Sequence, residues 1–434
     1  MSEQDGKQVA TLQRPATDDP KAWKAYWSQQ GQLWRTEPEI DVERQKYLAE
    51  RRAIMPDIEQ GIYRFKDVIL SRADVEWLLV THEIVQELAN WSEGNHQRRY
   101  GLDLRGANLR QVDLSGLPLT GLLGSSISHG QEEFTIERYS RATILLQDTN
   151  LKRADLGGAL LRGAHLEGAV LHEALLRGVN LRGAHLEGAD LYRAQLQDAY
   201  LREAHLQGAN LRGAFLDTAT NLTDVTLSDE QYGIASFADI HWSDVNLNVV
   251  NWSQLKMLGD EQEAKQKKYR NGLMKNQDRR LNEYQAAIRA NRQLAVALQS
   301  QGMNEDAARF AYRAQKLQRV VLRQQKKFGQ YFFSLLHDLL AGYGYRPGRS
   351  VVWYLIIIFG FALTYHVLGG LSLFPPDAFI FSIMSFHGRG FFPSLSSETN
   401  LHNPLVMLAA AEAIIGLLIE ISFIATFTQR FFGK

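Results

Sequence analysis

This 434-residue sequence contains no cysteine, and its 48 basic and 48 acidic residues leave no net charge. The lack of cysteine excludes disulfides, thiolate nucleophiles and cysteine-rich metal sites. The charge balance removes the basic surface that draws proteins to nucleic acid, so we expect no nucleic-acid partner. The first twenty residues are polar throughout. We therefore expect no signal peptide and assign membrane insertion to later segments.

Sequence motifs of catalysis are missing as well. We find no HExxH, no GxSxG, no phosphate-binding GxxxxGK followed by Ser or Thr, and no strand-flanked dinucleotide fingerprint. The glycine-rich stretch GYGYRPG at 342–348 lies beside an apolar run, and we interpret it as a helix break. These absences predict a protein that is not an enzyme, with no catalytic residues, no metal site and no cofactor.

Leucine dominates the middle of the chain, where it recurs every five residues. It occupies positions 104, 109 and 114 and then every fifth position from 146 to 216, with alanine two residues before most of them. On a helix, a step of five would rotate successive leucines by about 140° around the axis. On a strand, an odd step alternates faces. The chain must therefore turn a corner every five residues to keep leucine inside.

The same stretch also repeats every twenty residues. The segments LRGAHLEGAVLHEALLRGVN (161–180), LRGAHLEGADLYRAQLQDAY (181–200) and LREAHLQGANLRGAFLDTAT (201–220) follow one another. Four corners per coil explain this longer period. The A(D/N)Lxx pattern resembles that of the pentapeptide-repeat family. The resemblance implies a four-sided right-handed β-helix over residues 101–255, interrupted at about 120–140, whose flat sides serve assembly or dock a protein or ligand.

A period of twenty should stack equivalent side chains in columns, at the inter-strand spacing of about 4.8 Å. His165, His185 and His205 form one column, beside arginines at 162, 182 and 202 and glutamates at 167 and 187. Stacked imidazoles could sense pH or bind a metal ion. The alternative is simple duplication of one coil, with solvated outward side chains.

The regions beside the repeats have helical patterns. Residues 1–100 hold five of the eight tryptophans and are expected to form a helical region that caps one end of the solenoid. Within them, Ser71 followed three residues later by Asp74 predicts a capping-box helix start. Residues 256–330 predict a helical hairpin similar to a tetratricopeptide pair, either a partner surface or a spacer. Residues 331–349 predict an amphipathic segment at the membrane surface.

Two apolar runs near the C-terminus are long enough to cross a bilayer. Residues 350–371 contain no Asp, Glu, Lys or Arg, and residues 404–427 contain only Glu412 and Glu420 as charged residues. About twenty apolar residues span a hydrocarbon core of roughly 30 Å. The loop between them, 375–393, opens with Asp377 as a helix cap before a nine-residue apolar run that is too short to span. This pattern predicts a helix that dips into the membrane and returns.

These features resemble the two-helix pore domain of the bacterial potassium-channel superfamily. The positions that match its filter are Ser385, Phe386, His387, Gly388, Arg389, Gly390 and Phe391. The Gly-x-Gly spacing is kept, but the threonines are absent and Arg389 stands between the glycines. Potassium selectivity therefore does not carry over.

The second apolar run supplies the expected pore-lining or gating positions. They are Glu412, Gly416, Glu420, Phe423 and Phe427. Carboxylates inside a membrane helix usually serve a pathway or pair with a base, for which His387 and Arg389 are the candidates. The alternative is a structural lock between the short helix and the second span. Gly416 either bends the helix as a gate or permits close helix packing.

Two helices cannot enclose a pore, so the resemblance implies a homo-oligomer, with four copies around one axis. Lys and Arg crowd the segment before the first apolar run, which predicts cytoplasmic termini at the inner (plasma) membrane and an external loop at 372–403. We thus expect a multidomain membrane protein: a β-helix, a helical hairpin, and two transmembrane helices with a re-entrant pore helix.

The predicted function is an oligomeric ion channel in the lipid membrane that passes an inorganic ion and carries a cytoplasmic solenoid for assembly, sensing or docking. The alternative is a membrane-anchored scaffold for protein–protein interaction without conduction, which Arg389 favours. A third hypothesis, DNA mimicry, requires an acidic surface. Residues 151–216 instead contain eight Lys and Arg against seven Asp and Glu.

Overall fold

The structure of the chain is a computed structural model. It describes residues 14–57, 60–90, 101–125, 142–268, 272–345, 347–369, 375–388 and 404–431. The chain divides into two compact units. The first comprises Met1–Asn276 with Val296–Met303, and the second comprises Gln277–Ala295 with Asn304–Lys434.

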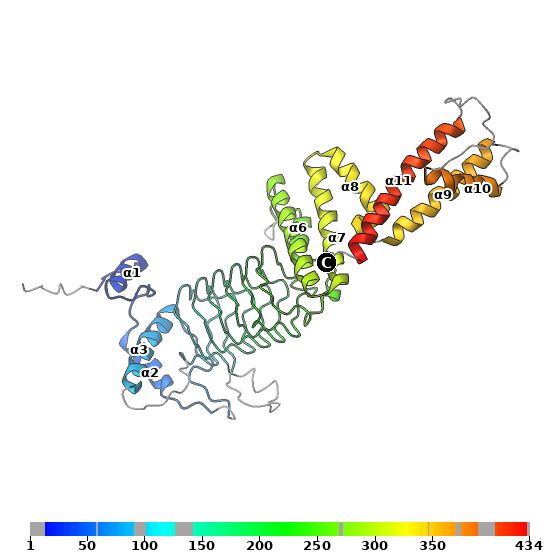
Figure 1. The fold of residues 1–434 in the computed structure, drawn as a ribbon. Helices are drawn as coiled ribbons and strands as arrows, with labels where there is room; N and C mark the ends of the chain where they lie inside the picture. The colour runs from blue at the N-terminus through cyan, green and yellow to red at the C-terminus, as the bar shows by residue number, and fades with distance from the viewer. Residues whose placement is uncertain are drawn as a thin grey trace, which may run out of the picture. The chain divides into compact units, whose positions relative to one another are not determined.

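The first unit is built around a stack of four-sided coils (Figure 1). Adjacent coils pair through parallel bridges, four in most pairs of coils, as in His165↔His185 and Val170↔Asp190. The repeated leucines and alanines fill the interior, where Ala184 and Leu186 are both 0% exposed. The predicted period and interior are therefore confirmed. Because a corner follows every bridge, the coils that the structure describes contain isolated bridges rather than extended strands.

Most corners lie two residues after the leucine and adopt the left-handed backbone region, either at glycine or at other residues such as Arg153 and Glu173. Gly163 has φ 64° and Gly183 has φ 62°. Glycine adopts this conformation without steric cost because it has no Cβ. A hydrogen bond of 3.0 Å from the Ala164 amide to the Leu161 carbonyl closes the corner. The repeat thus encodes both the interior and the turns.

Helices α1 (Pro20–Gln29), α2 (Val42–Arg52) and α3 (Arg72–Asn90) precede the coils. The predicted capping box is present at the start of α3: the Ser71 amide donates to Asp74 Oδ2 at 2.8 Å, and the Asp74 amide donates to Ser71 Oγ at 3.2 Å. Just before it, Ile69 forms a parallel bridge with Asn108 of the first coil. The chain leading into α3 therefore pairs with the first coil and extends the stack on one of its four sides.

The other end of the stack is closed by η1 (Trp252–Gln254) and α5 (Gly259–Lys265). Asp260 of α5 is 0% exposed and accepts from Arg212 Nε at 2.6 Å and from the Phe237 amide at 2.6 Å. Residues 228–234 leave the coil as a small hairpin held by an antiparallel Ser228↔Ile234 bridge.

Helices α6 (Gln277–Ser300), α7 (Asn304–Gln324) and α8 (Phe328–Ala341) follow, and η2 (Gly342–Gly344) ends α8. Asp338 joins α8 to α7. Its carboxylate accepts hydrogen bonds from two residues of α7, Tyr312 Oη at 2.9 Å and Arg319 Nη1 at 2.8 Å. Burial alone would raise the pKa of Asp338, but these two hydrogen bonds, together with the positive charges of Arg319 and Lys316, outweigh burial and lower it.

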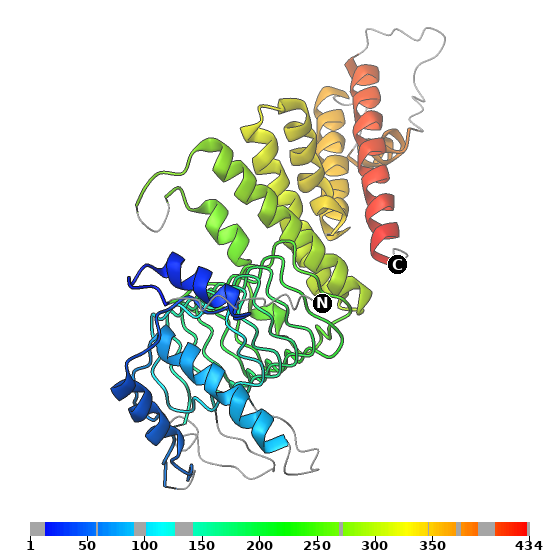
Figure 2. The same cartoon turned by 90° about the vertical axis from the view of Figure 1, so that its left-hand side faces the viewer.

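The chain ends with α9 (Pro347–Gly369), α10 (Pro375–Phe386) and α11 (Pro404–Phe431). The short α10 packs against both long helices, and the long helices pack against each other (Figures 1 and 2). Its start differs slightly from the prediction: Asp377 lies inside the first turn and does not cap it, because α10 already begins at Pro375, where proline fits a helix start.

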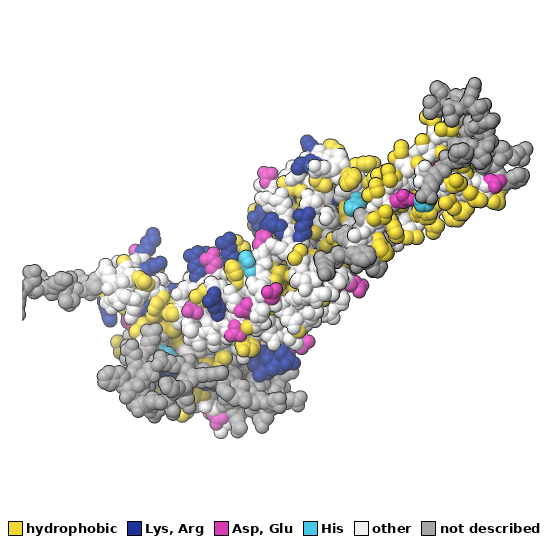
Figure 3. Space-filling model, viewed as in Figure 1, with side chains coloured by type: hydrophobic (Ala, Val, Ile, Leu, Met, Phe, Trp, Pro, Cys, Tyr) yellow, Lys and Arg dark blue, Asp and Glu magenta, His cyan; other side chains and the backbone are white. Residues whose placement is uncertain are grey.

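Two segments of these helices, Gly348–Leu368 and Pro404–Ile424, are long and apolar enough to cross a membrane, each with mean hydropathy 2.1. Only 17% of each segment is buried, whereas the core helix of a soluble protein is mostly buried. Apolar side chains therefore cover this part of the surface (Figure 3). The most exposed include Val367, Leu363, Phe359, Met407, Ile414 and Ile424.

Candidate functional site

Glu412 lies at the centre of the packing between α9, α10 and α11 and is 0% exposed. Tyr365 Oη of α9 donates to its Oε2 at 2.7 Å, and Ser382 Oγ of α10 lies 2.5 Å from its Oε1. The same Ser382 hydroxyl lies 2.9 Å from the Ile358 carbonyl oxygen. One buried carboxyl thus links all three helices.

Neither tyrosine nor serine was among the partners that the sequence suggested for Glu412. The expected partner His387 binds elsewhere, and Arg389 lies outside the described residues. The signal that could have revealed Tyr365 and Ser382 is their polarity, since each interrupts an otherwise apolar run.

His387 directly follows α10 and joins the two long helices at a second polar point. Its Nδ1 contacts Glu420 of α11, and its Nε2 lies 3.3 Å from Tyr354 Oη of α9. The side chains of His387 and Glu420 are 39% and 36% exposed. The expected pairing of a loop base with a carboxylate of the second apolar run is therefore found at Glu420. This pair lies on the exposed surface of the hairpin formed by α9 and α11.

Gly416 lies one turn after Glu412 on α11, where the end of α10 meets the helix. A Cβ at this position would lie 2.1 Å from the carbonyl oxygen of Phe386, far inside van der Waals contact. Helix α11 continues through Gly416 without interruption. Close packing is thus the observed consequence of this glycine, while a gating bend stays a prediction.

The remaining filter and gate positions fall into three groups. Ser385 and Phe386 are buried among the three helices, at 1% exposure each, and Gly388 is exposed with φ 69°. Phe423 and Phe427 lie on α11 with ring centroids 6.0 Å apart. The predicted positions Arg389, Gly390 and Phe391 lie outside the described residues.

The histidine column on the coils has the predicted geometry. Ring centroids are 4.9 Å apart between His165 and His185 and 4.7 Å apart between His185 and His205, and both pairs are nearly parallel, at 4°. His165 Nδ1 bonds to Glu167 at 2.9 Å, and His185 Nδ1 bonds to Glu187 at 3.1 Å. The column is therefore a ladder of His–Glu pairs on one side of the stack.

The third histidine of the ladder has a different partner. His205 Nδ1 lies 3.2 Å from Thr226 Oγ1, because Gln207 replaces the glutamate of the earlier coils. The regular part of the ladder thus comprises two layers, those of His165 and His185.

The family model for pentapeptide repeats matches residues 145–183, 180–217 and 189–229, in eight copies. The coils are a pentapeptide-repeat domain. This match does not extend to α9, α10 or α11, so the resemblance of those helices to a channel pore stays a prediction.

Solved pentapeptide-repeat proteins resemble this domain. Rfr23 from the cyanobacterium Cyanothece 51142 is 27% identical over 31% of this chain and 91% of its own, with a TM-score of 0.26. A protein of the Arabidopsis thaliana thylakoid lumen is 30% identical over 22% of this chain and 63% of its own, with a TM-score of 0.21. TM-scores this low carry no structural argument, so the assignment rests on the repeat match and on the coil geometry. No curated protein matches the chain.

Proposed function

We propose that the protein is an oligomeric membrane channel in which α9, α10 and α11 of several copies surround an aqueous axis and the pentapeptide-repeat domain lies in the cytoplasm. The observation that carries the proposal is the His387–Glu420 pair. Both side chains are more than one-third exposed on a hairpin whose other surface is mostly apolar. Polar groups at membrane depth face a helix-bundle interior or water, not lipid. A pore or an interface between copies provides that environment.

The size and packing of α10 support the same proposal. This helix has 12 residues, about 18 Å at the rise of an α-helix, so it is too short to cross and packs between the two long helices. Non-helical backbone after such a helix is tolerated at membrane depth where protein covers it or where it lines a water-filled cavity. The chain turns at Gly388, just after α10, and is non-helical backbone of this kind.

Helix α8 supports an orientation with the repeat domain in the cytoplasm. Its exposed face carries large apolar side chains, as an interfacial helix does. They are Phe328, Phe332, Phe333, Leu335 and Leu339. The basic residues of α7, among them Arg313, Arg319 and Arg323, precede it. Basic residues concentrate on the cytoplasmic side of membrane helices.

The test is current recording from the purified full-length protein in planar bilayers, together with native mass spectrometry of its oligomeric state. We expect tetramers that conduct, and a Glu420→Gln variant with altered unitary conductance, because the substitution removes a charge from the axis. Thr364→Ala is the matched control. Thr364 is an exposed polar residue of α9 whose hydroxyl donates within its own helix, to Gly360, so its loss should leave conductance unchanged.

The second candidate is a membrane-anchored scaffold, favoured by the arginine between the two filter glycines. Folded tetramers that stay silent under several ligands and pH values would support the scaffold. Monomers would contradict both the pore and the assembly. If current is present, a changed ion preference in Arg389→Ala would tie this loop to conduction.

A further inference from the structure

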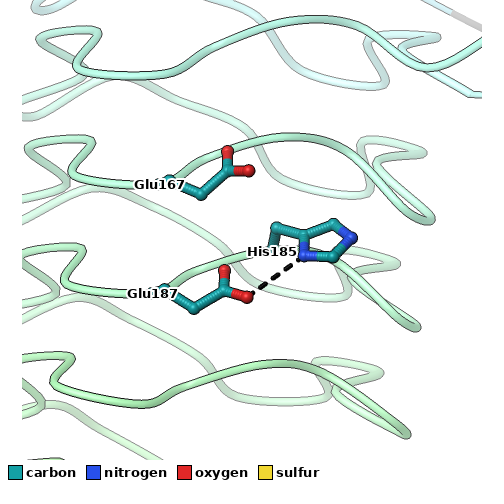
Figure 4. A group of neighbouring side chains, drawn as sticks. All are labelled: Glu167, His185 and Glu187. Atoms are coloured by element: carbon teal, nitrogen blue, oxygen red, sulfur yellow. Dashed lines mark hydrogen bonds and ion pairs between the residues drawn. The ribbon is translucent and has the colours of Figure 1, made fainter. Parts of the chain in front are cut away.

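The His–Glu ladder contains a group of metal-ligating atoms that the channel proposal does not use. The ligand atoms of Glu167, His185 and Glu187 all lie within 4.8 Å of one another (Figure 4). The three side chains come from two adjacent coils, and each is half-buried on the side of the stack. Among the described residues, neither carboxylate has a lysine or arginine within ion-pair distance.

In Glu167 and in Glu187, one carboxylate oxygen is hydrogen-bonded and the other is not. Oε1 of Glu167 is held by His165, and Oε1 of Glu187 is held by His185. Oε2 of both residues is shielded from solvent and has no hydrogen-bond partner in the part of the chain that the structure describes. A carboxylate oxygen shielded from water without a donor is costly, and a bound ion is one of the explanations that such a group requires.

Gln207 continues the same column one coil further along the stack. It is the next member of the column after Glu167 and Glu187, since the Gly168 amide donates to the Glu187 carbonyl and the Gly188 amide to the Gln207 carbonyl. Gln207 is only 9% exposed, and its Oε1 also has no hydrogen-bond partner among the described residues. Three successive coils therefore each carry, at the equivalent position, a side-chain oxygen without a hydrogen-bond partner among the described residues.

We propose that Glu167, His185 and Glu187 bind one divalent transition-metal ion, with Zn²⁺ the best fit. One imidazole nitrogen and two carboxylate oxygens are a common donor set for this ion, with water in the open position. Tetrahedral zinc with bonds of about 2.1 Å needs ligand atoms roughly 3.4 Å apart. Ligand atoms that now lie up to 4.8 Å apart must therefore approach one another when the ion binds.

Coordination through Nδ1 requires the neutral imidazole with its hydrogen on Nε2, so the contact between Nδ1 and Glu187 Oε1 gives way to the bond to the metal. His165 stays outside the ligand set and holds Glu167 in position through Oε1, as a residue behind a metal ligand typically does. The ion ties two coils together on one side of the stack. Its expected role is structural, at the centre of the repeat domain.

The experiment is titration of the chelator-treated full-length protein with Zn²⁺ by calorimetry and with Co²⁺ by visible absorption. We expect one ion per chain, and His185→Asn and Glu187→Gln each to weaken Zn²⁺ binding at least tenfold. The Co²⁺ absorption bands that report a nitrogen ligand should disappear in His185→Asn. Thermal unfolding of each variant without metal shows that loss of binding does not come from loss of the fold.

His172→Asn is the matched control. His172 forms the same kind of pair, Nε2 to Asp190 Oδ2 at 2.5 Å, but no third ligand among the described residues is grouped with it. Its substitution should leave Zn²⁺ affinity unchanged. A Gln207→Glu variant is the converse test. It places a third carboxylate in the column, beside His205, and we expect a second ion to bind.

Two results would overturn the proposal. One is the absence of saturable binding at one ion per chain in the wild-type protein. The other is binding that survives unchanged in both His185→Asn and Glu187→Gln, which would place the ion elsewhere.

Discussion

The carbonyl oxygen of Phe386 occupies the place where a side chain on residue 416 would begin, 2.1 Å from the position of a Cβ. This contact seats the end of α10 directly on the backbone of α11. Phe386 is 1% exposed and packs with Ile358 and Ile419 in one apolar cluster. The position of α10 between the long helices therefore depends on residue 416 having no side chain.

We predict that Gly416→Ala destabilises the C-terminal helices, because the added methyl group must displace backbone. Overpacking of this kind costs about 1–3 kcal/mol or more, and it should lower the thermal midpoint of the detergent-solubilised protein. Gly360→Ala is the control. A Cβ at Gly360 meets nothing within 4 Å, so alanine should be neutral or slightly stabilising there. Equal midpoints for the two variants would contradict the close contact at Gly416.

Glu412 is expected to carry a proton. The Ser382 hydroxyl has a single hydrogen, but it lies within hydrogen-bond distance of both the Ile358 carbonyl and Glu412. A protonated Glu412 resolves this, because it donates to Ser382 while Ser382 donates to Ile358. We predict that Glu412→Gln, which keeps a donor and an acceptor, leaves the thermal midpoint nearly unchanged.

Glu412→Ala should instead be strongly destabilising. It leaves Tyr365 and Ser382 without their partner and opens a cavity, which costs about 2–5 kcal/mol. The infrared carbonyl band of a protonated carboxylic acid, present in the wild-type protein and absent from Glu412→Gln, checks the assignment. A Glu412→Gln variant as unstable as Glu412→Ala would show that Glu412 is ionised.

Acid should weaken the contact between α7 and α8. The pKa of Asp338 is lowered in the folded protein, so the carboxylate stabilises the fold at pH values above the ordinary aspartate pKa of about 4. This contribution is lost as the pH falls through the lowered pKa. The thermal midpoint should therefore drop below pH 4 in the wild-type protein. Asp338→Asn should already be less stable at pH 7 and should show a smaller drop.

Asp260 is predicted to be essential for the stability of the end of the coil stack that α5 closes. It is fully buried and accepts from Arg212 and from the Phe237 amide. Asp260→Ala leaves the Phe237 amide without this acceptor, while the Arg212 guanidinium group keeps Glu263 at 2.7 Å, so we expect a cost of about 1–3 kcal/mol. Chemical unfolding of the wild type and the variant measures the difference. Glu173→Ala, which removes an exposed pair with Arg153, should leave the unfolding curve in place.

The coils could be predicted in detail because a repeat carries its own register. Once leucine every five residues requires a corner, the twenty-residue period places His165 on His185 at the spacing between adjacent chains. The observed 4.9 Å follows from the sequence period alone. The positions of α9, α10 and α11 were also readable, since run length and apolar composition determine which segments form long helices and which form a short one.

The partners of Glu412 could not be predicted in the same way. Tyr365 is 47 residues away from it and Ser382 is 30 residues away, on different helices. Which of several polar side chains meets a carboxyl depends on how far each helix rotates about its axis and where the helices cross. The sequence indicated that Glu412 and Glu420 would find partners, but it did not distinguish the buried site from the exposed one.

The amino-acid sequence by itself determined the four-sided coil, its leucine interior, its stacked histidines and the two long apolar helices, because each follows from a local period or from local composition. Only the tertiary structure decided that Glu412 is enclosed by Tyr365 and Ser382, that His387 binds Glu420 on the open surface, and that Gly416 receives the end of α10. These relationships depend on packing between segments that share no periodicity, so no local pattern encodes them.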